Sequence, residues 1–169
     1  MYAQISQYLS LWLINEVMGS SVSIHKVNYE DMQCVCRTEN PHQYSNSSAA
    51  AHTVLLINTL PPGMQGCLIP GTLPIDEEEA AMNAMLSEPK GNDREIIAYG
   101  KNANDDTVLK KYQQLTGLGF KNVSVYPGGM FEWLLLQDIY GATSFPTTSK
   151  ELDILKYKPP SGRQKLLLN

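Results

Sequence analysis

Three short apolar runs, separated by stretches with helical spacing, constrain the fold of this chain more than any other feature. The runs are residues 54–57, 95–99 and 123–126. Each is nearly continuous in apolar residues, which is typical of strands buried on both faces of a parallel sheet. Apolar residues three or four positions apart predict helices at residues 77–86, 107–118 and 130–140. Because parallel strands need right-handed crossovers, we predict an α/β fold with helices on both faces of the sheet.

The rest of the chain is arranged around this core. The pattern predicts a short strand at residues 22–27, a short helix at 29–36 and a loop at 38–52. Residues 2–18 have the spacing of an amphipathic helix. We therefore divide the chain into an N-terminal helix (1–21), one domain (22–149) and a basic, proline-containing C-terminal tail (150–169).

The charge balance narrows the function. The chain has 13 basic and 17 acidic residues, a net charge of −4. A protein that binds nucleic acid without sequence preference is usually basic, so nucleic acid is disfavoured as a partner. Only 18% of the 169 residues are charged, which is below the usual quarter or so. We therefore expect a protein partner to cover part of a rather neutral surface.

The three cysteines, Cys34, Cys36 and Cys67, form no recognisable framework. Their odd number argues against structural disulfides and favours a reducing compartment. His42 and His52 follow Cys34 and Cys36, but the spacing matches no common zinc motif. We therefore expect neither a metal nor a cofactor. We also expect no membrane span and no secretion signal, and hence a cytoplasmic location.

Three pieces of sequence, taken in order, resemble the rhodanese-like domain family. LLINTL (55–60) is similar to the family's LIDVR strand, and CLIPGTL (67–73) is similar to its GHIPGA turn. The third piece resembles the strand before the active-site loop and the GFxNV and GGxxxW motifs, and consists of IIAY (96–99), GFKNV (119–123) and GGMFEW (128–133). The resemblance covers roughly residues 22–147 and implies the same parallel α/β fold.

The family transfers sulfur through a cysteine persulfide, and this cysteine opens a C-R-x-G-x-R-S loop at the end of a strand. The corresponding loop follows Tyr99 and consists of Gly100, Lys101, Asn102, Ala103, Asn104, Asp105 and Asp106. Gly100 has no side chain that could act as a nucleophile. Asp106 stands where related phosphatases with a C-x5-R loop have arginine. The resemblance therefore implies a catalytically inactive member with a degenerate active-site loop.

Local charge points the same way. Residues 76–106 contain nine acidic and three basic side chains, a net charge of −6, which would repel thiosulfate or phosphate. Asn58 and Leu60 replace an aspartate and an arginine of the family strand. We expect Cys67 to be a packed thiol rather than a relocated nucleophile. Gly100→Cys alone is expected not to create sulfurtransferase activity.

We expect the degenerate loop to be filled by its own side chains. NDDT (104–107) precedes a helical pattern, which predicts that Asp105 or Asp106 caps the helix that starts near Thr107. The carboxylate would then occupy the position of a substrate anion.

The two extensions contain the candidate partner-binding residues Leu9, Trp12, Tyr157 and Lys158. The stripe that contains Leu9 and Trp12 could pack on its own domain or dock on another protein. The last twenty residues have five basic and two acidic side chains, and a Pro-Pro pair prevents a continuous helix. This tail could be frayed, or it could lie extended on a partner.

The GGMFEW motif, followed by FPTT (145–148), is also similar to rhodanese-like proteins of large eukaryotic DNA viruses. We therefore expect a non-catalytic interaction or structural module, such as a minor capsid or virion-associated component, in the cytoplasm or the virion. Two alternatives stay open. One is a sulfurtransferase-related enzyme of altered chemistry, and the other is a domain that senses a small ligand at the carboxyl edge of the sheet.

Overall fold

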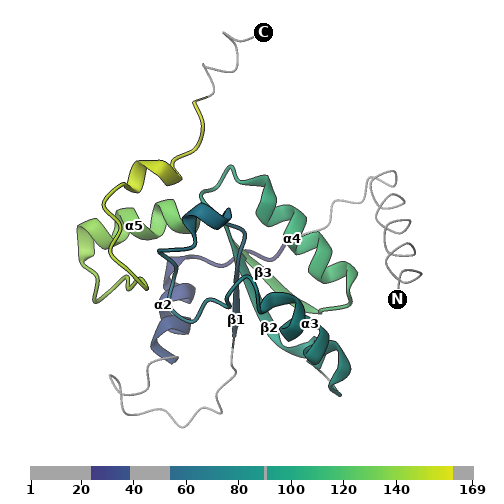
Figure 1. Cartoon of the computed structure of the whole chain (residues 1–169). Coiled ribbons are helices and arrows are strands. Elements are labelled where there is room, and N and C mark those ends of the chain that lie inside the picture. Colours follow the sequence, from purple (N-terminus) through teal and green to yellow (C-terminus); the bar gives the residue numbers. More distant parts are fainter. Residues whose placement is uncertain (1–23, 39–53, 90, 162–169) are drawn as a thin grey trace, which may run out of the picture.

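The computed structural model describes residues 24–38, 54–89 and 91–161 (Figure 1). Its sheet has three parallel strands in the order β1-β2-β3. The strands are β1 (Leu55–Asn58), β2 (Glu95–Tyr99) and β3 (Asn122–Tyr126). Each lies within one residue of a strand predicted from the apolar runs. The register pairs Leu55 with Ile96 and Glu95 with Asn122.

Helices cover both faces of this sheet, as predicted (Figure 1). One face packs against α2 (Tyr29–Thr38) and α5 (Gly129–Tyr140), and the other packs against α3 (Glu78–Ser87) and α4 (Asp106–Gly117). Short 3₁₀ turns complete the described elements, namely η1 (Pro62–Met64), η2 (Gly91–Asp93) and η3 (Ile154–Tyr157). None of the described helices is long and apolar enough to cross a membrane.

Neighbouring strand residues point into two different cores. Leu56 and Ile97 belong to the core between the sheet and helices α2 and α5. Ile57 and Ile96 belong to the core between the sheet and helices α3 and α4. Both cores are almost fully shielded from solvent, which explains why the strands read as continuous apolar runs rather than as alternating ones. Burial of this apolar surface supplies most of the driving force for folding.

The predicted strand at residues 22–27 is reduced, in its described part, to one parallel bridge beside β3. Lys26 forms an isolated parallel bridge with Val125, and the backbone then turns away. The side chain of Asn28 explains the turn, because its Oδ1 accepts hydrogen bonds from the backbone N–H groups of Glu30 and Asp31 at 2.9 and 3.0 Å. Backbone N–H groups in the first turn of a helix have no acceptor within the helix, and a side-chain oxygen commonly takes that place.

The predicted domain boundary at residue 149 also needs correction. After α5 the chain folds back along this helix and forms η3 (Figure 1). Phe145 and Tyr157 are buried in the core below α5. The indole Nε1–H of Trp133 donates a hydrogen bond to the carbonyl of Pro146 at 2.9 Å. The domain therefore continues at least to Tyr157. Residues 1–21 and most of the predicted loop at 38–52 lie outside the described residues.

Candidate functional site

The loop of residues 100–105 leaves the carboxyl end of β2 and packs against the first turn of α5. The carbonyl of Gly100 accepts a hydrogen bond from the N–H of Met130 at 2.9 Å, and that of Lys101 accepts one from Phe131 at 2.8 Å. Gly129 has a φ of +59°, and a Cβ atom there would lie 2.5 Å from the Gly100 carbonyl oxygen. The close approach therefore requires glycine, and the loop uses two free N–H groups of α5.

Asp105 fills the inside of this loop. Its Oδ2 accepts a hydrogen bond from the backbone N–H of Lys101 at 2.9 Å. Its Oδ1 accepts from the backbone N–H of Thr107 at 3.1 Å and from the Thr107 hydroxyl at 2.6 Å. Asp105 is therefore the N-cap of α4, and the predicted cap is confirmed at one of the two positions proposed. Asp106 is the first helical residue and is exposed.

The loop leaves no space for a side chain at Gly100. A Cβ atom at this position would lie 2.5 Å from Cγ2 of Val108, 2.6 Å from Oδ2 of Asp105 and 2.9 Å from Oγ1 of Thr59. Real Cβ atoms do not approach other heavy atoms this closely. The volume into which a nucleophile would project is thus occupied by a carboxylate and two packed side chains.

Asn102 ties the outer side of the same loop to the end of the domain. Its side chain is buried, and its Nδ2 donates a hydrogen bond to the carbonyl of Tyr157 at 2.6 Å. Its Oδ1 accepts from the N–H of Asn104 at 3.0 Å. Sequence reasoning placed Asn102 in the loop but missed this contact, because the partner is 55 residues away. Ala103 and Asn104 are exposed on the outside.

A neutral pair of amides stands at the end of β1. Asn58 is buried, and its Oδ1 accepts from the Nε2 of Gln65 at 2.7 Å and from the N–H of Leu60 at 3.1 Å. Its Nδ2 donates in return to Oε1 of Gln65 at 3.1 Å. Gln65 was not identified from the sequence. Gln65 thus supplies hydrogen-bond partners to the buried amide of Asn58, and no charged side chain is needed beside the loop.

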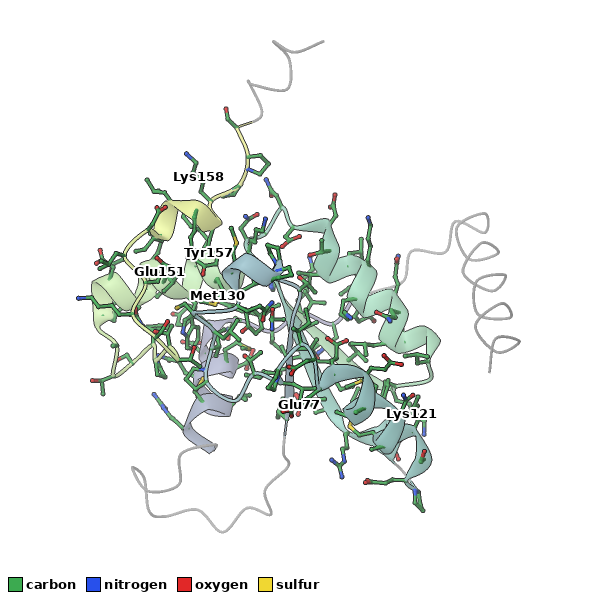
Figure 2. The ribbon with its side chains drawn as sticks, in the orientation of Figure 1. Glu77, Lys121, Met130, Glu151, Tyr157 and Lys158 are labelled. Carbon is green, nitrogen blue, oxygen red and sulfur yellow. The ribbon has the colours of Figure 1, made fainter. Side chains whose placement is uncertain are left out.

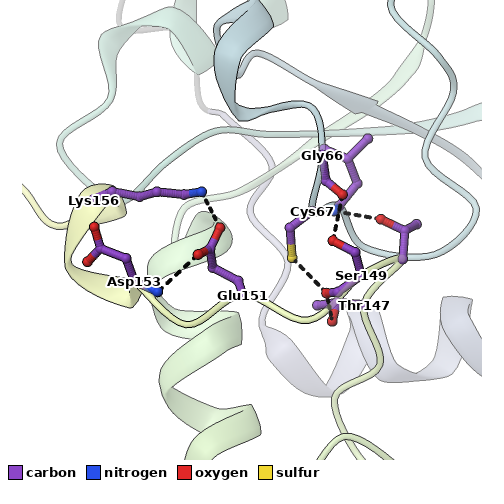
Figure 3. A network of polar contacts seen from close by, with 9 residues as sticks. Gly66, Cys67, Thr147, Ser149, Glu151, Asp153 and Lys156 are labelled. Carbon is purple, nitrogen blue, oxygen red and sulfur yellow. Dashed lines mark hydrogen bonds and ion pairs between the residues drawn. The ribbon is translucent and has the colours of Figure 1, made fainter.

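Cys67 is a packed thiol on the α5 side of the sheet (Figure 3). It is 3% exposed, and its Sγ donates a hydrogen bond to the carbonyl of Ser149 at 3.2 Å. The hydroxyl of Ser149 donates to the carbonyl of Gly66 at 2.7 Å. Burial raises the pKa of the Cys67 thiol, and the nearby charge of Glu151 raises it further. A group held in the thiol form is a poor nucleophile.

The structure corrects one of the partner-binding predictions. Tyr157 is fully buried in the chain's own core together with Met130, so its ring is not available to a partner. Its place was hard to predict because the charged residues around it are typical of a solvated tail. Lys158 is exposed and points away from the body of the domain (Figure 2). Leu9 and Trp12 lie outside the described residues. Within the described ranges, no cluster of three or more His, Cys, Asp or Glu side chains could hold a metal ion.

Comparison with models of known protein families shows the class of protein to which the chain belongs. A family model of the rhodanese-like domain matches residues 36–136, which is more than half of the chain. The chain therefore belongs to the rhodanese-like domain family. The matched range contains β1, β2 and β3 together with the degenerate loop. A search of curated proteins found no match.

Several solved structures are similar in fold. An uncharacterised protein from Saccharomyces cerevisiae is 21% identical, with a TM-score of 0.45, over 68% of this chain and 93% of that one. A protein from Anabaena is 16% identical, with a TM-score of 0.42, over 84% of this chain and 90% of that one. A single-domain sulfurtransferase from Saccharomyces cerevisiae is 18% identical, with a TM-score of 0.42, over 75% of this chain and 99% of that one.

Proposed function

We propose that this chain is a non-catalytic rhodanese-like domain that acts as an interaction or structural module. The observation that carries the proposal is the position of the Asp105 carboxylate, which accepts the N–H groups of Lys101 and Thr107. These are the donors that an anionic substrate would need at the end of β2. A second observation supports it, because the Asn102–Tyr157 hydrogen bond ties the loop down from outside.

An assay of thiosulfate and cyanide tests the catalytic half of the proposal. We expect no thiocyanate from the native chain, and none from Gly100→Cys, because the new Cβ atom would already clash with Val108 and the Asp105 carboxylate. An active sulfurtransferase in the same assay is the positive control. Turnover by the native chain that Cys67→Ser abolishes would overturn the proposal in favour of altered enzyme chemistry.

Protein capture tests the interaction half. The full chain is compared with one that lacks residues 1–20 and 162–169. Residues 150–161 are kept because Tyr157 belongs to the core. We expect the shortened chain to lose its partners, and a full-length Lys158→Glu variant to bind them more weakly if they are acidic. Recovery of the same partners by both chains would show that the extensions are not the docking elements.

The resemblance to viral proteins extends the proposal to a large assembly. Only 18% of the residues are charged, and apolar side chains are exposed on α5 and on the segment that follows it. Both features are compatible with burial in such an assembly. We propose a minor capsid or virion-associated role. Density-gradient fractionation of a lysate that contains the chain and the intact particles tests this role. The chain should sediment with intact particles, and recovery entirely in the slow fraction would contradict the role.

A further inference from the structure

The segment that covers Cys67 is polar, although it runs between two buried aromatic residues. Phe145 and Tyr157 are 3% and 0% exposed and anchor the segment at its two ends. None of the residues 146–153 between these anchors is buried. Segments with few buried apolar contacts open locally at a lower free-energy cost than the core does. We call residues 146–153 the flap, and we expect it to lift while both anchors stay in place.

Hydrogen bonds hold the flap on the segment that contains Cys67 (Figure 3). The N–H of Thr148 donates to the carbonyl of Leu68 at 2.9 Å, and its Oγ1 accepts from the N–H of Leu68 at 3.0 Å. The hydroxyl of Ser149 donates to the carbonyl of Gly66 at 2.7 Å, and the Sγ of Cys67 donates to the carbonyl of Ser149 at 3.2 Å. The bonds of Thr148 and of the Ser149 hydroxyl lie at the surface, where water competes for the same groups.

A groove of about 660 Å³ lies between the flap and α5. Thr147, Ser149 and Glu151 are the flap residues that matter here, and all three line the groove. Ser149 is also the hydrogen-bond partner of the Cys67 thiol. One stretch of flap backbone therefore separates the thiol from the groove, and a reagent in the groove reaches the thiol without any unfolding of α5.

The hydroxyl of Tyr157 is a second buried polar group near Cys67. It is shielded from solvent and has no hydrogen-bond partner among the described residues. Burial raises the pKa of this hydroxyl, the ammonium of Lys156 lowers it, and Cys67 and Glu151 raise it, so these groups act on one another as one cluster. A buried hydroxyl without a partner is unfavourable. It is available as a donor to a polar group attached to Cys67.

We propose that Cys67 is a modification site for low-molecular-weight disulfides, which reach it when the flap lifts. Under the closed flap the thiol is buried and keeps its proton. Under the lifted flap it ionises as an ordinary cysteine does, and the thiolate attacks one sulfur of the disulfide. A new S–S bond forms as that of the reagent breaks, and the other half leaves as a thiolate that takes up the proton lost by Cys67. One group is bound per chain without turnover, so the inference does not depend on the proposed function.

The Cys34→Ser variant of the full chain tests the proposal, because it leaves two buried thiols with different covers. Cys36 is 4% exposed and belongs to α2, whereas Cys67 is 3% exposed beneath the flap. The variant is incubated with oxidised glutathione, and mass spectrometry of its peptides follows the mixed disulfide at each cysteine. We expect Cys67 to react at least about ten-fold faster than Cys36, because the flap opens more readily than the core. Equal rates, faster reaction at Cys36, or no adduct at Cys67 would overturn the proposal.

Thr148→Val, made in the same background, loosens the flap without changing any charge, because it removes the acceptor of the Leu68 N–H. It should speed the reaction at Cys67 several-fold and leave Cys36 unchanged. Thr116→Val is the matched control, since Thr116 lies in α4 on the other side of the sheet and its hydroxyl donates within that helix. This control should change neither rate. An unchanged rate at Cys67 in Thr148→Val, or equal acceleration at both cysteines, would contradict a local cover.

The adduct should also hold the flap open. The Sγ of Cys67 is 3.2 Å from the carbonyl oxygen of Ser149, which leaves no room for a second sulfur atom between them. Lys150 in the flap and Lys110 in α4 are both exposed. Trypsin should cut after Lys150 several-fold faster in the adduct than in the reduced chain, and after Lys110 at the same rate in both. Equal cutting after Lys150 in the two forms would overturn the role of the flap as the cover of this site.

Discussion

The chemistry of the degenerate loop depends on two residues, Gly100 and Asp105. Gly100 has no side chain, and the Asp105 carboxylate fills the space beside it. The two positions therefore depend on each other. A side chain at Gly100 would displace the cap of α4, and loss of the cap would leave two backbone donors without their partner.

Gly100→Ala should destabilise the domain by about 1–3 kcal/mol, because the new methyl group overpacks against Val108 and Asp105. Gly117→Ala in α4 is the control, since nothing lies within 4 Å of a Cβ atom there. It should be neutral, or stabilising by up to about 1 kcal/mol. Urea unfolding followed by the fluorescence of Trp133 measures both, and equal free energies for the two variants would contradict the crowding at Gly100.

Asp105→Ala should cost about 1–2 kcal/mol of unfolding free energy, because the N–H groups of Lys101 and Thr107 lose their acceptor. Asp106→Ala removes the same charge one residue later, from an exposed side chain. It should cost a few tenths of a kcal/mol through the helix dipole. The same unfolding experiment distinguishes the two variants. A larger loss of unfolding free energy at Asp106 would contradict the assignment of Asp105 as the cap.

At the scale of elements, η3 and the segment before it act as a part of the domain rather than as a tail. Tyr157 fills the core below α5, and its carbonyl holds Asn102 of the loop. The end of the domain thus helps to keep the loop closed. The same segment contributes Ser149, which accepts the hydrogen bond of the buried Cys67 thiol.

Tyr157→Ala should cost about 3–5 kcal/mol, as expected for a large side chain removed from a core. Leu155→Ala in the same turn should cost less than about 0.5 kcal/mol, because Leu155 is largely exposed. Deletion of residues 162–169 should leave the melting temperature almost unchanged, whereas deletion of 154–169 should prevent folding. A stable domain without residues 154–169 would show that η3 is dispensable.

At the scale of the whole molecule, two buried tyrosines link stability to alkaline pH. Burial raises the pKa of Tyr99, whose hydroxyl contacts Oγ1 of Thr72 at 2.8 Å. Burial and the carboxylate of Glu132, to which its hydroxyl donates at 2.6 Å, raise the pKa of Tyr126. A raised pKa means that the folded chain holds these protons more tightly than the unfolded chain does.

The stability from this linkage is fully present below the unfolded tyrosine pKa of about 10 and is lost as the pH rises above it. We therefore expect the free energy of unfolding to fall steadily above pH 10. Tyr126→Phe should flatten this fall, whereas Tyr140→Phe, at an exposed position, should not. Urea titrations between pH 8 and 11.5 measure the slopes. Identical slopes in all three chains would contradict a role for Tyr126.

The sequence by itself determined the features that consecutive residues encode. Apolar runs marked the strands, helical spacing marked α2 to α5, and the Asp-Asp-Thr order marked the cap of α4. These depend on backbone geometry and on hydrogen bonds between near neighbours, and so they can be predicted locally. The identity of Gly100 alone also excluded a nucleophile at that position.

Tertiary structure alone decided how the loop is closed and where the domain ends. The Asn102–Tyr157 hydrogen bond spans 55 residues, and the Cys67–Ser149 contact spans 82. The crowding at Gly100 arises in part from Thr59, which follows β1, and from Val108 of α4. Such contacts depend on how the helices pack on the sheet, because that packing depends on the shapes of several segments that are distant in the chain. No local pattern distinguishes a buried Tyr157 from an exposed one.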